Sequence, residues 1–185
     1  VSVSEMVSAY TAFANHGIRT APMFVSRIED NEGNTIATFQ PRMNEVIGAE
    51  NAMKMLTMLM GVVDGGTAGR LRYRYNLEGQ IGAKTGTTNN NSDGWFIGFT
   101  PQLVSGCWVG GEERDIHFDS MSMGQGATMA LPIWAIFMKK VYADPTLGIR
   151  PDVKFDLPDG YDPCYKQKSD QDDFEQVDGI DEVFE

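Results

Sequence analysis

One seven-residue segment, Gly82-Ala83-Lys84-Thr85-Gly86-Thr87-Thr88, restricts the fold and the chemistry of this chain more than any other. Its threonines favour a strand, and a glycine inside a strand marks a place where another element comes close. Side chains alternate between the two faces of a strand, so Thr85 and Thr87 point the same way. The segment therefore predicts an edge strand that presents Lys84 and two hydroxyl groups to a ligand.

The residues before this segment predict two helices and a hairpin. Ser2 and Glu5 form the pattern of a capping box, and apolar residues recur after it at helical spacing until Gly17. Asp30 and Gly33 lie in a turn between two β-rich runs. The predicted elements are, in order, a helix over 3–16, a hairpin with strands 23–28 and 35–39, a helix over 49–63 and a loop over 64–79.

Three strands, a loop and a last helix are predicted from residue 80 onward. The strands are 80–88, 95–100 and 104–110, the loop is 111–131, and the helix runs from Pro132 to about Ala143. The apolar density of residues 95–99 indicates a strand buried on both faces. The fold class is therefore α/β of the α+β type, an antiparallel sheet flanked by helices.

The charge divides the chain into a nearly neutral body and an acidic tail. The net charge is −11, and residues 152–185 hold twelve acidic and three basic residues. We predict one domain over 1–145 and an acidic tail over 146–185, disordered from about residue 166. Nucleic-acid binding is disfavoured, because it usually needs a basic surface.

Cysteine and histidine are too few to indicate a metal site or a redox site. Cys107 and Cys164 leave a disulfide open, although burial as a small apolar side chain is the commoner fate of a lone cysteine. His16 and His117 are isolated in the sequence. We therefore predict no metal and no cofactor.

The Lys-Thr-Gly-Thr edge has the residue types that an acyl-transfer site requires. An exposed strand edge can hold a peptide by backbone hydrogen bonds, and two hydroxyls can hold its terminal carboxylate. Lys84 would lower the proton affinity of a nearby nucleophile and base. The amide of Thr87 would stabilise a developing oxyanion, an effect of about 3 kcal/mol. The predicted catalytic residues are Lys84 and Thr87, and the predicted substrate-binding residues are Thr85, Gly86, Thr87 and Thr88.

Several motifs occur in a fixed order along the chain. They are Ser4 to Tyr10, Arg27 to Asp30 with Gly33, Met58 to Val63 with Gly66 to Ala68, Lys84 to Asn89, Asp93 to Pro101, Trp108 to Gly110 and Ala130 to Trp134. Over residues 1 to about 145 the chain resembles the C-terminal half of the transpeptidase domain of class A penicillin-binding proteins. The Lys-Thr-Gly triad is one of three motifs in such enzymes.

The resemblance implies a β-lactamase/transpeptidase-like fold and a serine acyl-enzyme that cross-links peptidoglycan stem peptides and is trapped by β-lactams. Lys84 would then help proton transfer, Thr85 and Thr87 would hold the carboxylate, and the Thr87 amide would be half of the oxyanion hole. The intact protein would be membrane-anchored, would act at the periplasmic, extracytoplasmic face of the membrane, and would carry a glycosyltransferase domain upstream.

The chain lacks the nucleophile that this resemblance requires. No serine is followed by a lysine three residues later, and neither Ser-x-Asn nor Tyr-x-Asn occurs. We therefore expect the second half of a serine acyl-transfer domain, inactive by itself. Two alternatives stay open: a D,D-carboxypeptidase or β-lactamase-related serine hydrolase, and a non-catalytic penicillin-binding sensor domain.

Two groups of residues have a structural and a functional interpretation. Trp95, Phe96 and Phe99 are expected in the core rather than around a ligand, because apolar strand residues usually pack. The series Arg70, Arg72 and Arg74 is expected in a solvated loop, with contact to a substrate carboxylate as the alternative.

Overall fold

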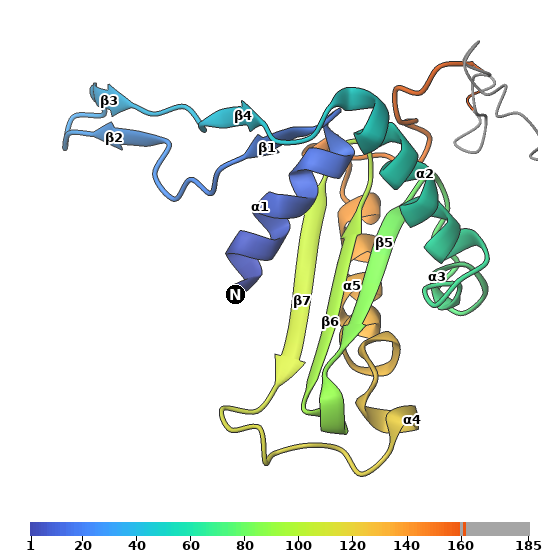
Figure 1. Ribbon diagram of the computed structural model, residues 1–185. Helices are drawn as coiled ribbons and strands as arrows, with labels where there is room; N and C mark the ends of the chain where they lie inside the picture. Colours follow the sequence, from blue (N-terminus) through green and yellow to red (C-terminus); the bar gives the residue numbers. More distant parts are fainter. Residues whose placement is uncertain (160, 162–185) are drawn as a thin grey trace, which may run out of the picture.

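The computed structural model describes residues 1–159 and residue 161, and its centre is a three-stranded antiparallel sheet (Figure 1). The strands are β5 (Gly82–Thr87), β6 (Asp93–Phe99) and β7 (Val104–Gly110), in the order β5-β6-β7. The two connections are short, a single 3-10 turn η1 (Asn89–Asn91) and the turn at residues 100–103. The sheet predicted from the apolar runs is confirmed, and β5 is an edge strand.

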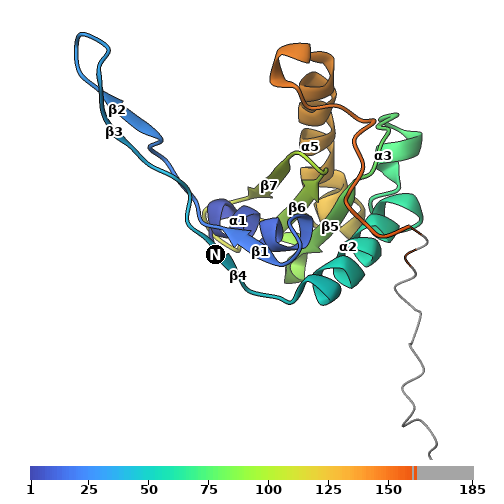
Figure 2. The same ribbon diagram turned by 90° about the horizontal axis from the view of Figure 1, so that it is seen from above.

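Helices cover both faces of this sheet. The last long helix, α5 (Gly126–Ala143), packs on one face, and α1 (Val3–Ala14) and α2 (Ala49–Asp64) lie against the other (Figures 1 and 2). The predicted capping box is present, because Ser2 accepts from the amide of Glu5 and the carboxylate of Glu5 accepts from the amide of Ser2. Both predicted helices before the sheet are confirmed.

The alternation of side chains along β6 connects the two layers. Phe96 points to α5, where its ring lies 5.3 Å from that of Trp134, and Ile97 points to the side of α1. Phe96, Ile97 and Phe99 are all buried, which confirms the strand buried on both faces. Gly98 faces α5 as well, since a Cβ there would lie 2.5 Å from the indole of Trp134.

A long arm extends from the body between α1 and α2 (Figures 1 and 2). It consists of β1 (Ile18–Thr20) paired with β4 (Met43–Glu45), and β2 (Arg27–Glu29) paired with β3 (Thr35–Thr38). The predicted hairpin is confirmed, and the carboxylate of Asp30 accepts from Glu32 and Asn34 in its turn. The run 23–26 is not a strand, although its β-rich pattern favours one, because it lies exposed where the arm changes direction.

Two segments that the sequence predicts as loops contain helices. The region after α2 contains the short helix α3 (Arg70–Tyr73), and the region after β7 contains α4 (Met121–Gly124). The last helix begins at Gly126 rather than at Pro132, so the proline lies inside α5. The reason is tertiary: glycine at position 126 allows the start of α5 to pack directly on the backbone of β5 and β6.

The packed body continues beyond residue 145, the predicted end of the domain. After η2 (Pro145–Leu147) the chain returns along the body, and the amide of Phe155 donates to Gln80. The ring of Phe155 is buried against Phe99, at 5.9 Å between centroids. The predicted disorder after about residue 166, and Cys164, lie outside the described residues. No helix in the described part of the chain is long and apolar enough to cross a bilayer.

Candidate active site

The free edge of β5 presents backbone groups to solvent. Thr88 donates its amide to the carbonyl of Asp93, and the register pairs Gly86 with Trp95 and Thr87 with Gly94. In an antiparallel ladder, hydrogen-bonded pairs alternate with non-bonded pairs. The amides and carbonyls of Thr85 and Thr87 therefore point away from β6, toward the free edge. This is the orientation that a peptide added as a further strand would require.

Lys84 brings its charge to the same edge. Its side chain is exposed, and its ammonium donates to the carbonyl of Thr85 at 2.7 Å. Because that carbonyl points to the free edge, the ammonium lies beside the backbone groups on which a substrate would pair. Lys84 makes no ion pair among the described residues, so its charge is free to act on a ligand.

The hydroxyls of Thr85 and Thr87 lie on the α5 side of the strand, on one face as the alternation predicts. Thr85 shares a hydrogen bond of 3.0 Å with Thr67, from the loop between α2 and α3. Thr87 accepts a hydrogen bond of 3.0 Å from the amide of Gly126, the first residue of α5. Two elements distant in the sequence thus hold the two hydroxyls that the sequence predicts as carboxylate ligands.

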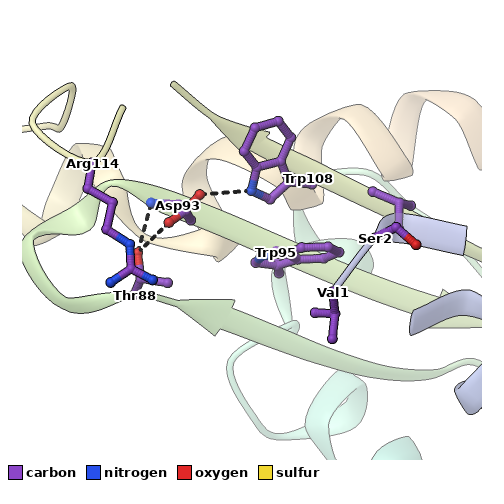
Figure 3. A pocket seen from close by; sticks show the side chains of 8 residues that line it. Val1, Ser2, Thr88, Asp93, Trp95, Trp108 and Arg114 are labelled. Carbon is purple, nitrogen blue, oxygen red and sulfur yellow. Dashed lines mark hydrogen bonds between the residues drawn. The ribbon is translucent and has the colours of Figure 1, made fainter. Parts of the chain in front are cut away.

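Thr88 lies on the other face of the sheet, where its side chain binds Asp93 rather than solvent (Figure 3). Its hydroxyl accepts from the amide of Asp93 at 2.9 Å and donates to the carboxylate at 3.1 Å. The indole of Trp108 and the hydroxyl of Ser92 donate to the same carboxylate. Together these bonds close the end of the β5–β6 ladder immediately after Thr87.

The carboxylate of Asp93 is stabilised in its charged form. Burial alone would raise its pKa, but hydrogen bonds from Trp108, Thr88 and Ser92 and the nearby charge of Arg114 hold the pKa of Asp93 below its usual range. Ser92 and Asp93, interpreted from sequence as turn residues, therefore form a charged clasp around Thr88.

A hollow of about 450 Å³ lies on this second face of the sheet (Figure 3). It is lined by the clasp residues Thr88, Asp93 and Trp108, together with Trp95, Arg114 and residues 1–3. Trp95, predicted to be core, is half-buried and forms part of this wall. The hollow lies opposite the hydroxyls of Thr85 and Thr87, so it is separate from the candidate substrate edge.

The arginine series near the site is structural in two of its three members. Arg70 donates to the carbonyl of Ala127 and to the hydroxyl of Thr128 at the start of α5. Arg72 donates to the carboxylate of Asp64 and to a backbone carbonyl. These contacts join the segment after α2 to the rest of the body, where the sequence predicts a solvated loop.

No local signal in the sequence marks the contacts that Thr67 and Gly126 make with the threonines of β5. Thr67 belongs to one of the motifs that carry the family resemblance, without a role of its own, and Gly126 falls in a predicted loop. A nucleophile is not found on this surface: in the described part of the chain, no serine hydroxyl is hydrogen-bonded to a lysine or a histidine.

Comparison with known proteins places this geometry in a family. Residues 1–106 match the model of the penicillin binding protein transpeptidase domain. Penicillin-binding protein 1A of Aquifex aeolicus is 35% identical over 158 residues, which cover 85% of this chain and 20% of that protein. Penicillin-binding protein 1F of Bacillus subtilis is 34% identical over 117 residues, covering 62% of this chain and 16% of that protein. The chain thus spans about a fifth of the length of these curated relatives.

Solved structures have the same fold. Penicillin-binding protein 1A from Haemophilus influenzae superposes with a TM-score of 0.73 at 25% identity, covering 85% of this chain and 28% of that one. PonA1 from Mycobacterium tuberculosis superposes with a TM-score of 0.67 at 24% identity, covering 84% of this chain and 41% of that one. The mixed helix and antiparallel-sheet architecture is that of the β-lactamase/transpeptidase fold.

Proposed function

This chain belongs to the penicillin binding protein transpeptidase family, and we propose that it supplies one wall of a serine D,D-transpeptidase site. The observation that carries the proposal is the free edge of β5. There the Lys84 ammonium, the outward amide of Thr87 and the hydroxyls of Thr85 and Thr87 occur within four consecutive residues of one strand. A peptide with a terminal carboxylate matches these groups in charge and in hydrogen-bonding capacity.

The reaction proposed for the intact protein is an acyl transfer between peptidoglycan stem peptides. A serine outside this chain attacks the carbonyl before the terminal D-alanine, the D-alanine leaves with a proton, and an amine of a second stem peptide takes the acyl group. Thr85 and Thr87 bind the carboxylate, and Gly86 lets the substrate approach the backbone closely. The amide of Thr87 stabilises the oxyanion, and Thr88 supports it from the other face through Asp93.

Lys84 acts in this proposal through its charge. An ammonium at the edge lowers the proton affinity of the serine and of its base, and it attracts the substrate carboxylate. β-Lactams would enter the same site, because their carboxylate and strained amide imitate the end of the stem peptide. A solved structure of PonA1 in complex with penicillin V supports this ligand class.

The setting follows from the same proposal. The intact protein acts outside the cytoplasm, anchored in the membrane, and a class A relative would also carry a glycosyltransferase domain. We propose that residues 1–145 contain the transpeptidase part, with the acidic tail of 146–185 outside the active site. The family names of the curated relatives support these assignments.

The test is labelling by a fluorescent penicillin of the intact protein that contains this chain. We expect a Ser-x-x-Lys motif upstream, covalent labelling of its serine, and a large loss of labelling rate in Lys84→Ala. Lys139→Ala is the matched control, because Lys139 is an exposed lysine of α5 without hydrogen bonds among the described residues. Labelling of Lys84→Ala at the wild-type rate would contradict the role of Lys84.

Product analysis separates the alternatives. Cross-linked dimers of stem peptides indicate a transpeptidase, whereas release of free D-alanine without dimers indicates a D,D-carboxypeptidase or a related hydrolase. Labelling without any turnover of peptide indicates a sensor domain. The acidic, mixed surface offers no basic stripe for nucleic acid, so nucleic acid has no place among the proposed partners.

A further inference from the structure

Thr87 and Gly126 lie 39 residues apart in the sequence, and the amide of Gly126 donates to the Thr87 hydroxyl at 3.0 Å. We infer that Gly126 is a positioning residue of the site: its amide fixes the Thr87 hydroxyl as a hydrogen-bond donor toward a carboxylate. The inference rests on the proposed function and adds to it a residue outside the Lys-Thr-Gly-Thr segment.

The polarity follows from the bonding capacity of a hydroxyl. Threonine has one O–H to donate and lone pairs that accept. A hydroxyl that already accepts from a backbone amide keeps its O–H available, and that of Thr87 has no acceptor among the described residues. The side chain is exposed at the substrate edge, so its O–H is free to donate there. An ionised carboxylate only accepts, and it is therefore the complement of this arrangement.

The position of Gly126 depends on its lack of a side chain. A Cβ at residue 126 would overlap the carbonyl oxygen of Gly86 and would lie 2.5 Å from that of Trp95. Both contacts are with backbone of the sheet, which cannot move aside as the end of a flexible side chain can. Any larger residue at this position must push the start of α5 away from β5 and weaken the bond to Thr87.

The start of α5 also provides a favourable field. The helix has 18 residues, and its N-cap Gln125 makes no side-chain cap. The first amides of a helix have no partner within the helix and carry partial positive charge. Thr87 receives one of these amides, and the bonds from Arg70 to Ala127 and Thr128 hold the same turn in place. The hydrogen bond from Gly126 therefore polarises the Thr87 hydroxyl in the direction that favours an anion.

The test compares acylation of the intact protein by benzylpenicillin and by its methyl ester, which lacks the anionic carboxylate. The variants are Gly126→Ala, Thr87→Val and the double variant. The control is Gly61→Ala, since Gly61 lies in α2 with open space around the position of a Cβ. Binding of the acid in Gly126→Ala should weaken by about 10- to 100-fold, the worth of one hydrogen bond to a charged group. Binding of the ester should change little.

The double variant decides whether Gly126 acts through Thr87. We expect no further loss when Gly126→Ala is added to Thr87→Val, because the hydroxyl is already absent. An additive loss, or equal losses for acid and ester, would mean that Gly126 only supports the fold and would overturn the inference. If Thr87→Val itself left binding of the acid unchanged, the proposed function of Thr87 would fail instead.

A second measurement does not need a Gly126 variant. The amide proton resonance of Gly126 in the intact protein should move when benzylpenicillin binds, because donation by the Thr87 hydroxyl to the carboxylate strengthens its acceptance from Gly126. The movement should persist in Thr87→Ser and vanish in Thr87→Val. A resonance that stays unchanged on binding to the wild-type protein would contradict the inference.

Discussion

Replacing Asp93 tests the clasp that closes the end of β5. The carboxylate accepts from the Trp108 indole at 2.9 Å, from the Thr88 hydroxyl at 3.1 Å and from the Ser92 hydroxyl at 3.2 Å. Asp93→Ala removes all three acceptors at once. We expect this variant to unfold more easily than the wild-type chain, with the loss concentrated at the β5–β6 end.

The magnitude can be worked from the surroundings of each donor. A hydrogen bond to a charged group contributes about 1.5–3 kcal/mol, but an exposed donor recovers much of this from water. Trp108 is 40% exposed, and Thr88 and Ser92 still bond to each other at 2.9 Å. We therefore expect Asp93→Ala to cost about 2–3 kcal/mol, and Asp93→Asn, which keeps an acceptor for Trp108, about 1 kcal/mol.

The same carboxylate gives a pH dependence with a defined sign. The pKa of Asp93 is held below its usual range, so its contribution is present above the unfolded pKa of about 3.9 and is lost as the pH falls through the folded pKa. The stability difference between wild type and Asp93→Asn should therefore be constant near neutral pH and shrink below about pH 4.

Urea denaturation of the chain from pH 3 to pH 7, followed by tryptophan fluorescence, measures both effects. The matched control is Asp152→Asn, because Asp152 is 71% exposed in a loose pair with Arg150 at 3.4 Å and should cost less than about 0.5 kcal/mol. A cost for Asp93→Ala no larger than the control, or a difference between wild type and Asp93→Asn that does not shrink in acid, would refute the account of the clasp.

Three further outcomes are expected. Lys84→Ala should leave the melting temperature within about 2 °C of wild type, because the side chain is exposed and bonds only to Thr85; a large decrease in a thermal melt would show that the lysine is structural. Phe96→Ala should destabilise the chain by about 3–5 kcal/mol, since the ring is fully buried against Trp134; chemical denaturation would contradict this with a cost below about 1 kcal/mol. Gly98→Ala should cost about 1–3 kcal/mol, because its Cβ would meet the same indole at 2.5 Å, and a neutral effect in the same assay would show that α5 can move aside.

Much of the fold can be predicted because its signals are local. The capping box at Ser2 and Glu5 marks the start of α1, and the dense apolar run around Phe96 marks the central strand. Alternation along β5 is enough to place Thr85 and Thr87 on one face. Such patterns depend on neighbours within a few residues, which the sequence displays directly.

The start of α5 cannot be predicted in this way, because its cause lies outside the helix. Proline is favoured in the first turn of a helix, so Pro132 suggests a later beginning. The helix instead starts at Gly126, where the missing side chain allows contact with Gly86 and Trp95 on the sheet. No periodic pattern within residues 126–131 reports a contact with another element.

The supporting residues of the candidate site are hidden for the same reason. Thr67 and Gly126 reach the threonines of β5 from 18 and 39 residues away in the chain. The place of Thr88 in the motif predicts substrate binding, but its alternation with Thr87 directs it to the other face, where Asp93 binds it. Ser92 and Asp93 lie in the turn that the sequence predicts, whereas their hydrogen bonds around Trp108 depend on the pairing of β6 with β7.

The edge of β5 is, in this account, one wall of a serine acyl-transfer site. The most direct measurement is a crystal structure of the intact protein acylated by benzylpenicillin. We predict the acyl carbonyl oxygen about 2.7–3.1 Å from the amide nitrogen of Thr87, with the carboxylate bonded to the hydroxyls of Thr85 and Thr87. An acyl group whose carbonyl and carboxylate both point away from β5 would contradict this assignment.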